Sequence, residues 1–149
     1  MNFNPIGIVK SPVKEGVDSN WGDVISEFHL NKELIDGLNG IEEFSNIIVV
    51  FYMDRSTFDK DRDIKRKPQG RDDMPEVGIF AQRAKHRPNP IGITNVRLLS
   101  VNENVLKVQG LDAIDNTPIF DIKPHFPVYD SCNKIKVPEW VDRLMKGYF

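Results

Sequence analysis

Short apolar and alternating stretches recur along the chain, and most of them have the length of β-strands. Residues 24–30 alternate imperfectly, as a partly buried strand does, and residues 47–53 form the continuous apolar run of a central strand. The predicted strands are residues 5–10, 24–30, 47–53, 77–82, 91–101, 105–109 and 118–122. Residues 102–104 have the character of a hairpin turn between the fifth and sixth of these strands.

Only two stretches have a helical pattern. Residues 31–38 predict a short helix with Asn31 as its N-cap, and residues 138–146 predict another with Pro138 in its first turn. Many short strands, few helices and no repeating strand–helix–strand unit predict a mostly β fold. We expect a small antiparallel β-barrel with short flanking helices, not a Rossmann sheet. At 149 residues the chain suits one domain, residues 1–149.

Residues 54–76 form the longest polar stretch, and Pro68, Gly70 and Pro75 interrupt any regular element within it. A loop of this length in a compact domain is usually functional or mobile. Lysines and arginines are frequent in this stretch and continue to position 87, with acidic residues among them. The segment therefore predicts a local positive patch on a protein of formal net charge −2.

Donor side chains are crowded into the segment that follows. Arg83, Lys85, His86 and Arg87 lie within five consecutive positions, and the Pro-Asn-Pro sequence after them stiffens the backbone. A run of cations is usually a solvated face, and Pro-Asn-Pro is usually a turn. Their fusion between two strand-like segments favours a preorganised binding loop.

A second polar cluster spans residues 110–125. Asp115 and Asn116 belong to an Asp-Asn-Thr-Pro sequence, which is a good turn on its own because Asp and Asn side chains bond nearby backbone. Asp121 and Lys123 are two positions apart in a predicted strand, so both side chains point to one face. They either pair with each other or line one pocket together.

Composition narrows the classes of function. The net charge does not indicate a nucleic-acid-binding protein. The single cysteine, Cys132, cannot form an internal disulfide, and the first residues lack a signal-peptide pattern, so we expect a cytoplasmic protein. The apolar runs are too short to span a membrane, and the histidines lack metal-ligand spacing. Dinucleotide, Walker and nucleophile-elbow motifs are absent from the sequence.

The two polar clusters, in this order, resemble the TrmO (TsaA-like) family. The first hallmark reads Phe-Ala-Gln-Arg at 80–83 and Arg-Pro-Asn-Pro-Ile-Gly at 87–92. The second reads Leu-Asp at 111–112, Asp-Asn-Thr-Pro at 115–118 and Asp-Ile-Lys-Pro at 121–124. Where this chain has Asp-Asn-Thr-Pro, the family has Asp-Gly-Thr-Pro.

The resemblance implies a small β-barrel that binds S-adenosylmethionine without a Rossmann fold, and a homodimer with the cofactor near the subunit interface. It also implies methylation of N6 of threonylcarbamoyl-adenosine at position 37, beside the anticodon of tRNA. Carried onto this sequence, it predicts these cofactor-binding residues: Asp54, Arg55, Arg83, Ile93, Asp115, Asn116, Thr117 and Pro118.

Methyl transfer from a sulfonium depends mainly on proximity and orientation. We expect Asp121 or His86 to be the base that takes the N6 proton. The residues predicted to bind the anticodon stem-loop of tRNA are Lys65, Arg66, Lys85, Arg87, Asn89 and Lys123. Two other interpretations stay open: a non-catalytic module that binds S-adenosylmethionine or RNA, and a methyltransferase acting on another nucleoside or a small molecule.

Overall fold

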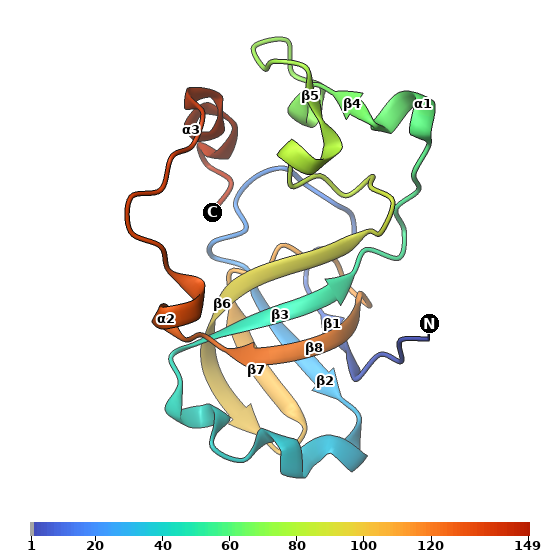
Figure 1. Cartoon of the computed structure of the whole chain (residues 1–149). Helices are drawn as coiled ribbons and strands as arrows, with labels where there is room; N and C mark the ends of the chain where they lie inside the picture. Colours follow the sequence, from blue (N-terminus) through green and yellow to red (C-terminus); the bar gives the residue numbers. More distant parts are fainter. Residues whose placement is uncertain (1) are drawn as a thin grey trace.

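The computed structural model describes residues 2–149, and its centre is a closed β-barrel (Figure 1). The order around the barrel is β1–β2–β7–β6–β3–β8, and every neighbouring pair is antiparallel. The strands are β1 (Gly7–Lys10), β2 (Ile25–Leu30), β3 (Asn46–Tyr52), β6 (Ile91–Asn102), β7 (Val105–Gln109) and β8 (Pro118–Pro124). The predicted mostly β fold, an antiparallel barrel with short flanking helices, is confirmed.

The ring closes where β1 meets β8. Gly7 lies opposite Ile119 in this pairing, and the Val9 N–H donates to the Thr117 carbonyl at 2.9 Å. On its other side β1 lies very close to β2: a Cβ on Gly7 would come within 2.5 Å of the His29 carbonyl oxygen. Only glycine fits this close approach of two backbones.

Alternate side chains of the strands fill the barrel. In β3, the best predicted central strand, Ile47, Val49 and Phe51 point inward and are at most 3% exposed. They meet Phe28 from β2 and Leu106 from β7, which are fully buried. Because strand side chains alternate between faces, the intervening positions of β3 face outward. β3 pairs with β6 on one edge and β8 on the other.

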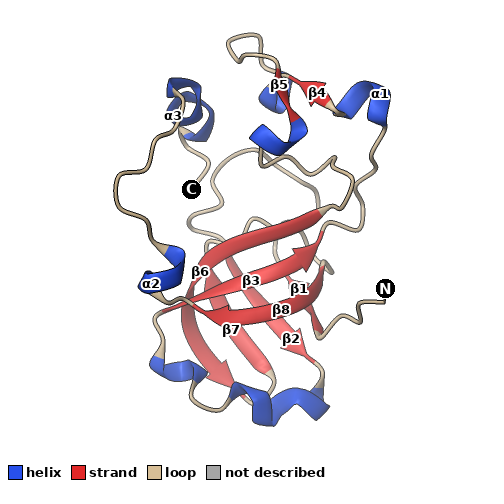
Figure 2. Ribbon diagram, in the orientation of Figure 1, coloured by secondary structure: helices blue, strands red, loops and turns tan. Residues whose placement is uncertain are grey.

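One end of the barrel is covered by η1 (Lys32–Leu38) and η2 (Ile41–Glu43), seen below the strands in Figure 2. The helix predicted at residues 31–38 exists, but it is a 3₁₀ helix. Asn31 occupies the N-cap position, as predicted, but its side-chain amide makes no capping hydrogen bond. It donates instead to the Pro5 carbonyl at 3.2 Å and so fastens the chain entering β1.

The long connection between β3 and β6, residues 53–90, lies above the other end of the barrel (Figure 1). Its elements are α1 (Lys60–Asp63), β4 (Lys65–Arg66), η3 (Pro68–Gly70), β5 (Val77–Gly78) and η4 (Ile79–Ala81). The predicted irregular loop therefore contains short regular elements. The strand predicted at residues 77–82 ends at Gly78, because β4 and β5 form a two-stranded ribbon with no further pairing partner.

The C-terminal part of the chain carries α2 (Pro127–Asp130) and α3 (Glu139–Met145), and α3 confirms the helix predicted at residues 138–146. After α3 the chain returns to the connection between β1 and β2. The Asn20 N–H donates to the Gly147 carbonyl at 2.9 Å, and the Trp21 N–H donates to the Tyr148 carbonyl at 2.8 Å. No helix in the described part of the chain is both long and apolar enough to cross a membrane.

Candidate functional site

The first polar cluster and the turn of the second, residues 110–117, lie at one end of the barrel, which we call the rim. The rim is formed by the connections between β1 and β2 (11–24), β3 and β6 (53–90), and β7 and β8 (110–117). These three connections leave the same end of the barrel because β1, β3 and β7 all run toward it (Figure 1). The topology thereby joins motifs that are distant in the sequence.

The turn that precedes β8 is fastened to the beginning of the β1–β2 connection. The Asp115 carboxylate accepts a hydrogen bond from the Ser11 N–H at 3.0 Å and pairs with Lys14 at 2.8 Å. The hydrogen bond from Lys14, followed by that from Ser11, lowers the pKa of Asp115 below its ordinary value. Lys10 donates to the Asn116 side-chain oxygen at 2.7 Å. The predicted cofactor residues of this turn are therefore held in place by hydrogen bonds and ion pairs with the β1–β2 connection and the end of β1.

Asn116 occupies the position at which this chain departs from the family pattern. Its φ is +65°, a left-handed conformation that glycine adopts freely and that asparagine tolerates better than most residues. The departure therefore preserves the turn. Thr117 is buried beside it, and Pro118 begins β8 opposite Ile8.

Arg83 reaches the rim from the β3–β6 connection. One of its guanidinium nitrogens donates to the Ile93 carbonyl in β6. A guanidinium has five N–H donors, so the others are free for a ligand. Asp54 and Arg55 lie shortly after the end of β3 and are exposed, and Arg55 donates to the Lys14 carbonyl at 3.3 Å. Lys14 thus joins two groups of predicted cofactor residues.

Two residues of the rim were not predicted as site residues from the sequence. The Asp112 carboxylate accepts hydrogen bonds from the Thr94 hydroxyl and, at 2.8 Å, from the Tyr148 hydroxyl. Burial and the charge of Asp112 raise the pKa of Tyr148, while the nearby Arg83 acts in the opposite direction. The position of Asp112 in the Leu-Asp part of the second motif could have marked it as a site residue. No local pattern marks Tyr148, which is 36 residues away along the chain.

Asp121, a predicted base, lies on the outer face of β8. It is opposite Val50 of β3, which is opposite Ile93 of β6, so all three residues share one face. Two strand spacings separate Asp121 from Ile93, or about 10 Å. Asp121 pairs with Lys123 at 2.6 Å, which confirms that the two side chains point to one face. The hydrogen bond and charge of Asp121 raise the pKa of Lys123.

His86, the other predicted base, lies in the β3–β6 connection. Its Nδ1 is 2.7 Å from the Thr57 carbonyl oxygen, which can only accept. Nδ1 is therefore the donor in this contact, and Nε2 is left to accept a proton. Within residues 2–149, no hydrogen bond or ion pair joins His86 to Asp121.

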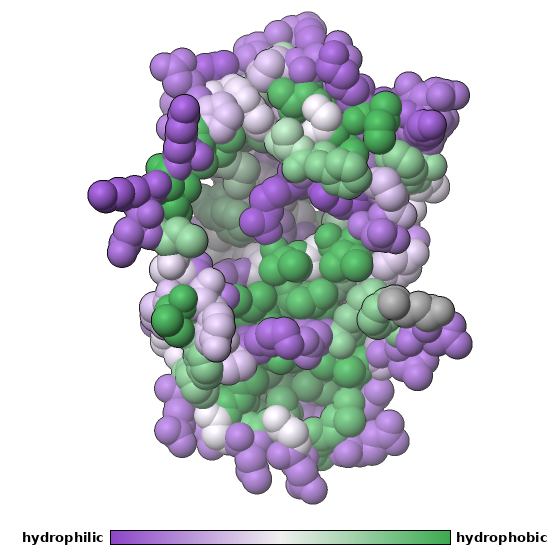
Figure 3. All heavy atoms as spheres, in the orientation of Figure 1, coloured by the Kyte–Doolittle hydropathy of each residue, from purple (hydrophilic) through white to green (hydrophobic). Residues whose placement is uncertain are grey.

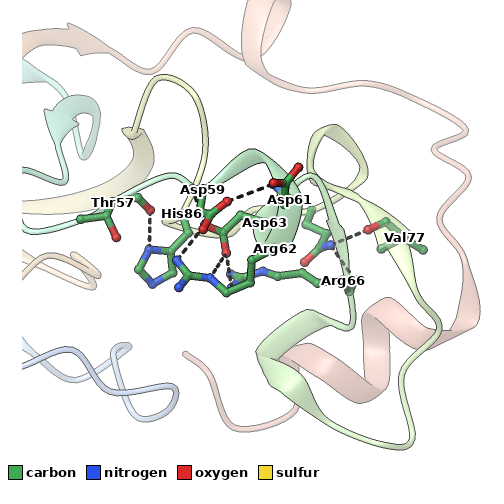
Figure 4. A network of polar contacts seen from close by, with 9 residues as sticks. Thr57, Asp59, Asp61, Arg62, Asp63, Arg66, Val77 and His86 are labelled. Carbon is green, nitrogen blue, oxygen red and sulfur yellow. Dashed lines mark hydrogen bonds and ion pairs between the residues drawn. The ribbon is translucent and has the colours of Figure 1, made fainter.

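A buried carboxylate organises the β3–β6 connection (Figure 4). Asp63 accepts two hydrogen bonds from Arg62, both at 3.1 Å, and one from the Asp59 N–H at 2.8 Å. Arg66 lies 3.6 Å from the same carboxylate. The hydrogen bonds from Arg62 and Asp59 lower the pKa of Asp63 to about 2. One predicted tRNA-binding cation, Arg66, therefore also has a structural partner.

The other predicted tRNA-binding cations differ in whether they already have a hydrogen-bond or ion-pair partner within the protein. Lys65 lies 3.7 Å from Glu76, and Arg87 donates to the Gln82 carbonyl at 3.0 Å, which fastens its own loop. Lys85 is exposed and extends over Gly16 of the β1–β2 connection. In the described residues Lys85 has no acidic side chain within ion-pair distance. Among the predicted tRNA-binding cations, Lys85 is therefore the one without a hydrogen-bond or ion-pair partner in the described residues.

Part of the Arg-Pro-Asn-Pro-Ile-Gly motif has a structural purpose. The Asn89 carbonyl accepts from the Ile91 N–H at 2.8 Å, and the Pro90 carbonyl accepts from Met53 at 2.8 Å, so the motif starts β6 against β3. A Cβ on Gly92 would lie 2.2 Å from the Phe51 ring, which packs directly over the glycine. The Asn89 residue itself is exposed at the rim.

The outer face around Asp121 is largely apolar. Tyr52, Ile91 and Ile93 are each more than a third exposed, and Tyr52 stacks on Phe120 with ring centroids 5.6 Å apart. Figure 3 shows an apolar band across the front of the barrel, crossed by a hydrophilic strip. An exposed apolar area of this kind suits contact with another protein surface.

The residues described here contain no group of three or more His, Cys, Asp or Glu side chains that could hold a metal ion. The arrangement defines a class of protein: a small closed β-barrel with a charged site on its rim. In a Rossmann protein, by contrast, the ligand lies at the carboxyl ends of parallel strands.

Comparisons with known proteins agree with this class. The family model TrmO_N, described as the tRNA-methyltransferase O N-terminal domain, matches residues 12–131. A protein of Archaeoglobus fulgidus named "S-adenosyl-L-methionine-binding protein" is 41% identical over 91% of this chain and 97% of its own length. The Escherichia coli protein named "tRNA (adenine(37)-N6)-methyltransferase" is 35% identical over 87% of this chain.

The comparison with solved structures finds the same family. The crystal structure of TrmO from Pseudomonas aeruginosa matches 94% of this chain with a TM-score of 0.76 and 25% identity. The chain covers 61% of that structure and 59% of the E. coli protein, so both relatives contain further sequence. The chain belongs to the TrmO family of S-adenosylmethionine-dependent tRNA methyltransferases. The resemblance drawn from the two sequence motifs is thereby confirmed.

The buried Asp63 predicts a defined pH dependence of stability. Its pKa falls from 3.8 to about 2 in the folded chain, so its stabilising contribution is present at higher pH and is lost as the pH falls from about 4 to about 2. Thermal unfolding of the wild type and Asp63→Asn should therefore differ near neutral pH, with the variant less stable. The difference should shrink as the pH falls through about 2 and approach zero below it, where the native carboxyl is protonated.

Asp61→Asn is the matched control, because Asp61 is exposed on the same short helix. It should unfold like the wild type at every pH. A difference between wild type and Asp63→Asn that is constant across the pH range would contradict the role of the ionised carboxylate.

Proposed function

We propose that this protein uses S-adenosylmethionine to methylate N6 of threonylcarbamoyl-adenosine at position 37 of tRNA. The observation that carries the proposal is the convergence of the first family motif and the turn of the second on the rim. Arg83 and the turn at residues 115–118 lie at the same end of the barrel, and Asp121 lies on the adjoining outer face in register with Ile93. The names of relatives as S-adenosylmethionine-binding proteins and tRNA adenine-37 N6-methyltransferases support it.

The side chains at the rim fit the chemistry of the cofactor. Its methionine part carries a carboxylate, for which the free N–H groups of Arg83 are suitable donors. Its adenosine part presents polar edges, and the fixed turn of Asp115 and Asn116 offers backbone and side-chain groups for them. Asp54, Arg55 and Ile93 complete the proposed cofactor set. S-adenosylmethionine, when bound, supplies a methyl group already activated by its sulfonium sulfur.

The chain itself must orient the acceptor and remove one proton. We propose that Asp121 accepts the N6 proton, either directly or through a water molecule. In the free protein one Asp121 oxygen pairs with Lys123, and the other accepts from the Ile122 N–H. A substrate phosphate that binds Lys123 would compete for its ammonium group and leave the carboxylate free to act as the base. His86, with its Nε2 as acceptor, is the second candidate for this role.

The anticodon stem-loop would approach the rim along the cations of the β3–β6 connection. We propose that Lys85 and Lys65 meet phosphates, while Arg87 and Arg66 mainly hold the connection in shape and present their remaining N–H groups. Asn89, exposed beside them, is proposed to contact the RNA as well.

We also propose a homodimer formed through the apolar outer face of β3, β6 and β8. This face exposes Tyr52, Ile91 and Ile93, and it adjoins both Asp121 and the rim. A second copy seated there would exclude water from the reacting groups. We place the reaction in the cytoplasm, which agrees with the single free cysteine, Cys132.

A methyl-transfer assay tests the proposed reaction. Labelled S-adenosylmethionine is incubated with tRNA that carries or lacks the threonylcarbamoyl group, and incorporation is expected only into the modified tRNA. Asp121→Asn should lower kcat by about 100-fold or more, the usual contribution of a positioned base, with little change in cofactor affinity. The exposed Asp72→Asn is the control and should retain full activity.

Other outcomes of this assay separate the alternatives. Cofactor binding without transfer to any tRNA would favour a non-catalytic binding module. Transfer to unmodified tRNA or to free nucleosides would favour another acceptor. Equal activity of Asp121→Asn and wild type would remove Asp121 from the mechanism.

The salt dependence of tRNA binding tests the proposed phosphate contact of Lys85. Replacing Lys85 with Gln should weaken binding of all tRNAs and lower the slope of log K against log salt by about 1. Lys32→Gln is the matched control, since Lys32 lies on η1 at the opposite end of the barrel. An unchanged slope in Lys85→Gln, measured by filter binding, would exclude a phosphate contact.

The proposed dimer predicts the effect of a charge on the apolar face. Ile91→Glu should shift the protein from dimer to monomer in sedimentation velocity, because a buried carboxylate at an interface lacks a partner. Ile135→Glu, in the exposed segment between α2 and α3, should leave the mass unchanged. A wild-type protein that sediments as a monomer at all concentrations would refute the dimer.

A further inference from the structure

Asp112 is a partly buried carboxylate whose charge is not balanced by a cation. Its two recorded partners, the hydroxyls of Thr94 and Tyr148, are neutral donors. The ion pairs found in residues 2–149 do not include Asp112, although Asp63, Asp73, Asp115 and Asp121 all have cationic partners. Because a partly buried charge is costly without a partner, an unbalanced carboxylate in a site indicates a place for a cationic ligand group.

The position of Asp112 relative to Arg83 is set by β6. Arg83 is anchored to the Ile93 carbonyl, and Asp112 is anchored to the side chain of the next residue, Thr94. Arg83 and Asp112 both act on the ionisation of the Tyr148 hydroxyl, in opposite directions. A cation and an anion, each bonded to neutral groups, are therefore anchored to two consecutive residues of β6. Such a pair matches a zwitterion, in which a carboxylate and an ammonium group share one carbon.

Tyr148 belongs to a segment that the family model does not match, since the match ends at residue 131. Backbone hydrogen bonds tie Gly147 and Tyr148 to Asn20 and Trp21, and Trp21 is buried. Gly22 packs so closely on Phe149 that a Cβ there would lie 2.6 Å from its backbone. Farther back, the guanidinium of Arg143 donates to the Asp73 carbonyl. These contacts hold the Tyr148 hydroxyl at the rim.

We propose that Asp112 binds the α-ammonium group of the amino-acid part of S-adenosylmethionine, with Arg83 on its α-carboxylate, and that Tyr148 is a positioning residue for Asp112. The inference rests on the proposed cofactor and adds the residues that recognise its zwitterionic end. A carboxylate has about four acceptor sites, so the bonds from Thr94 and Tyr148 leave room for an ammonium donor. The C-terminal segment thereby becomes part of the proposed cofactor site.

Three ligands that differ in charge test this assignment by calorimetry. S-adenosylmethionine carries the sulfonium and the ammonium, S-adenosylhomocysteine keeps only the ammonium, and methylthioadenosine has neither. Asp112→Asn should weaken binding of the first two ligands by about 10- to 100-fold, the usual worth of a charged hydrogen bond. Methylthioadenosine should bind the variant and the wild type equally.

Tyr148→Phe should show the same pattern with a smaller loss, about 3- to 10-fold, because it removes one neutral hydrogen bond to the carboxylate. Tyr129→Phe is the matched control, since Tyr129 is 81% exposed on α2. Asp142→Asn is the control for Asp112→Asn, because Asp142 is exposed on α3. Both controls should bind all three ligands like the wild type.

The outcomes distinguish this inference from the function on which it rests. If the wild type binds S-adenosylmethionine and Asp112→Asn weakens all three ligands equally or none, the ammonium contact is wrong and the proposed function stands. If only S-adenosylmethionine is weakened, Asp112 faces the sulfonium and the assignment is overturned. If the wild type binds none of the three, the cofactor assignment and the inference both fail.

Discussion

The short pairing of β1 with β8 closes the barrel, and the geometry of the rim depends on it. Only two register pairs join these strands, Gly7 with Ile119 and Ile8 with Pro118. The pairing extends toward the rim, where the Asn116 N–H donates to the Val9 carbonyl at 2.8 Å. A closed barrel has no free edge to shift in register, so the turn before β8 is held in one position relative to β1. The charged contacts of that turn therefore follow from backbone pairing deep in the fold.

The charged residues at the rim divide into those with charged partners in the protein and those that we propose bind a ligand. Asp63 is fully buried and saturated by Arg62 and the Asp59 N–H, so it fixes the β3–β6 connection above the barrel. Arg83 and Asp112 have only neutral hydrogen-bond partners, and we propose that both bind the cofactor. Aspartate and arginine thus serve two different purposes in this protein. Burial and the charge of the hydrogen-bond partner distinguish the structural residues from the proposed ligand-binding ones. A preorganised set of this kind is what an orientation-dependent methyl transfer requires.

Strand patterns and motifs predicted much of this structure, because strand alternation and turn chemistry are local properties. The predicted strand at residues 105–109 coincides with β7, and the family resemblance correctly predicted the barrel fold and the cofactor. Contacts between residues that are far apart in the sequence could not be predicted from local sequence patterns. The helix at residues 31–38 became a 3₁₀ helix, and the Asn31 side chain was used to hold Pro5 rather than to cap. The bond from Tyr148 to Asp112 spans 36 positions, and no local pattern encodes it.

We propose that the cofactor binds on the rim, between the β6 anchor of Arg83 and the turn before β8. A crystal structure of the protein grown with S-adenosylhomocysteine tests this location directly. We predict the ligand beside Arg83 and Asp115, with the C-terminal segment still bonded to Trp21. A ligand in the separate groove between the β4–β5 ribbon and α3, which is lined by Asp73, Trp140 and Arg143, would contradict the claim.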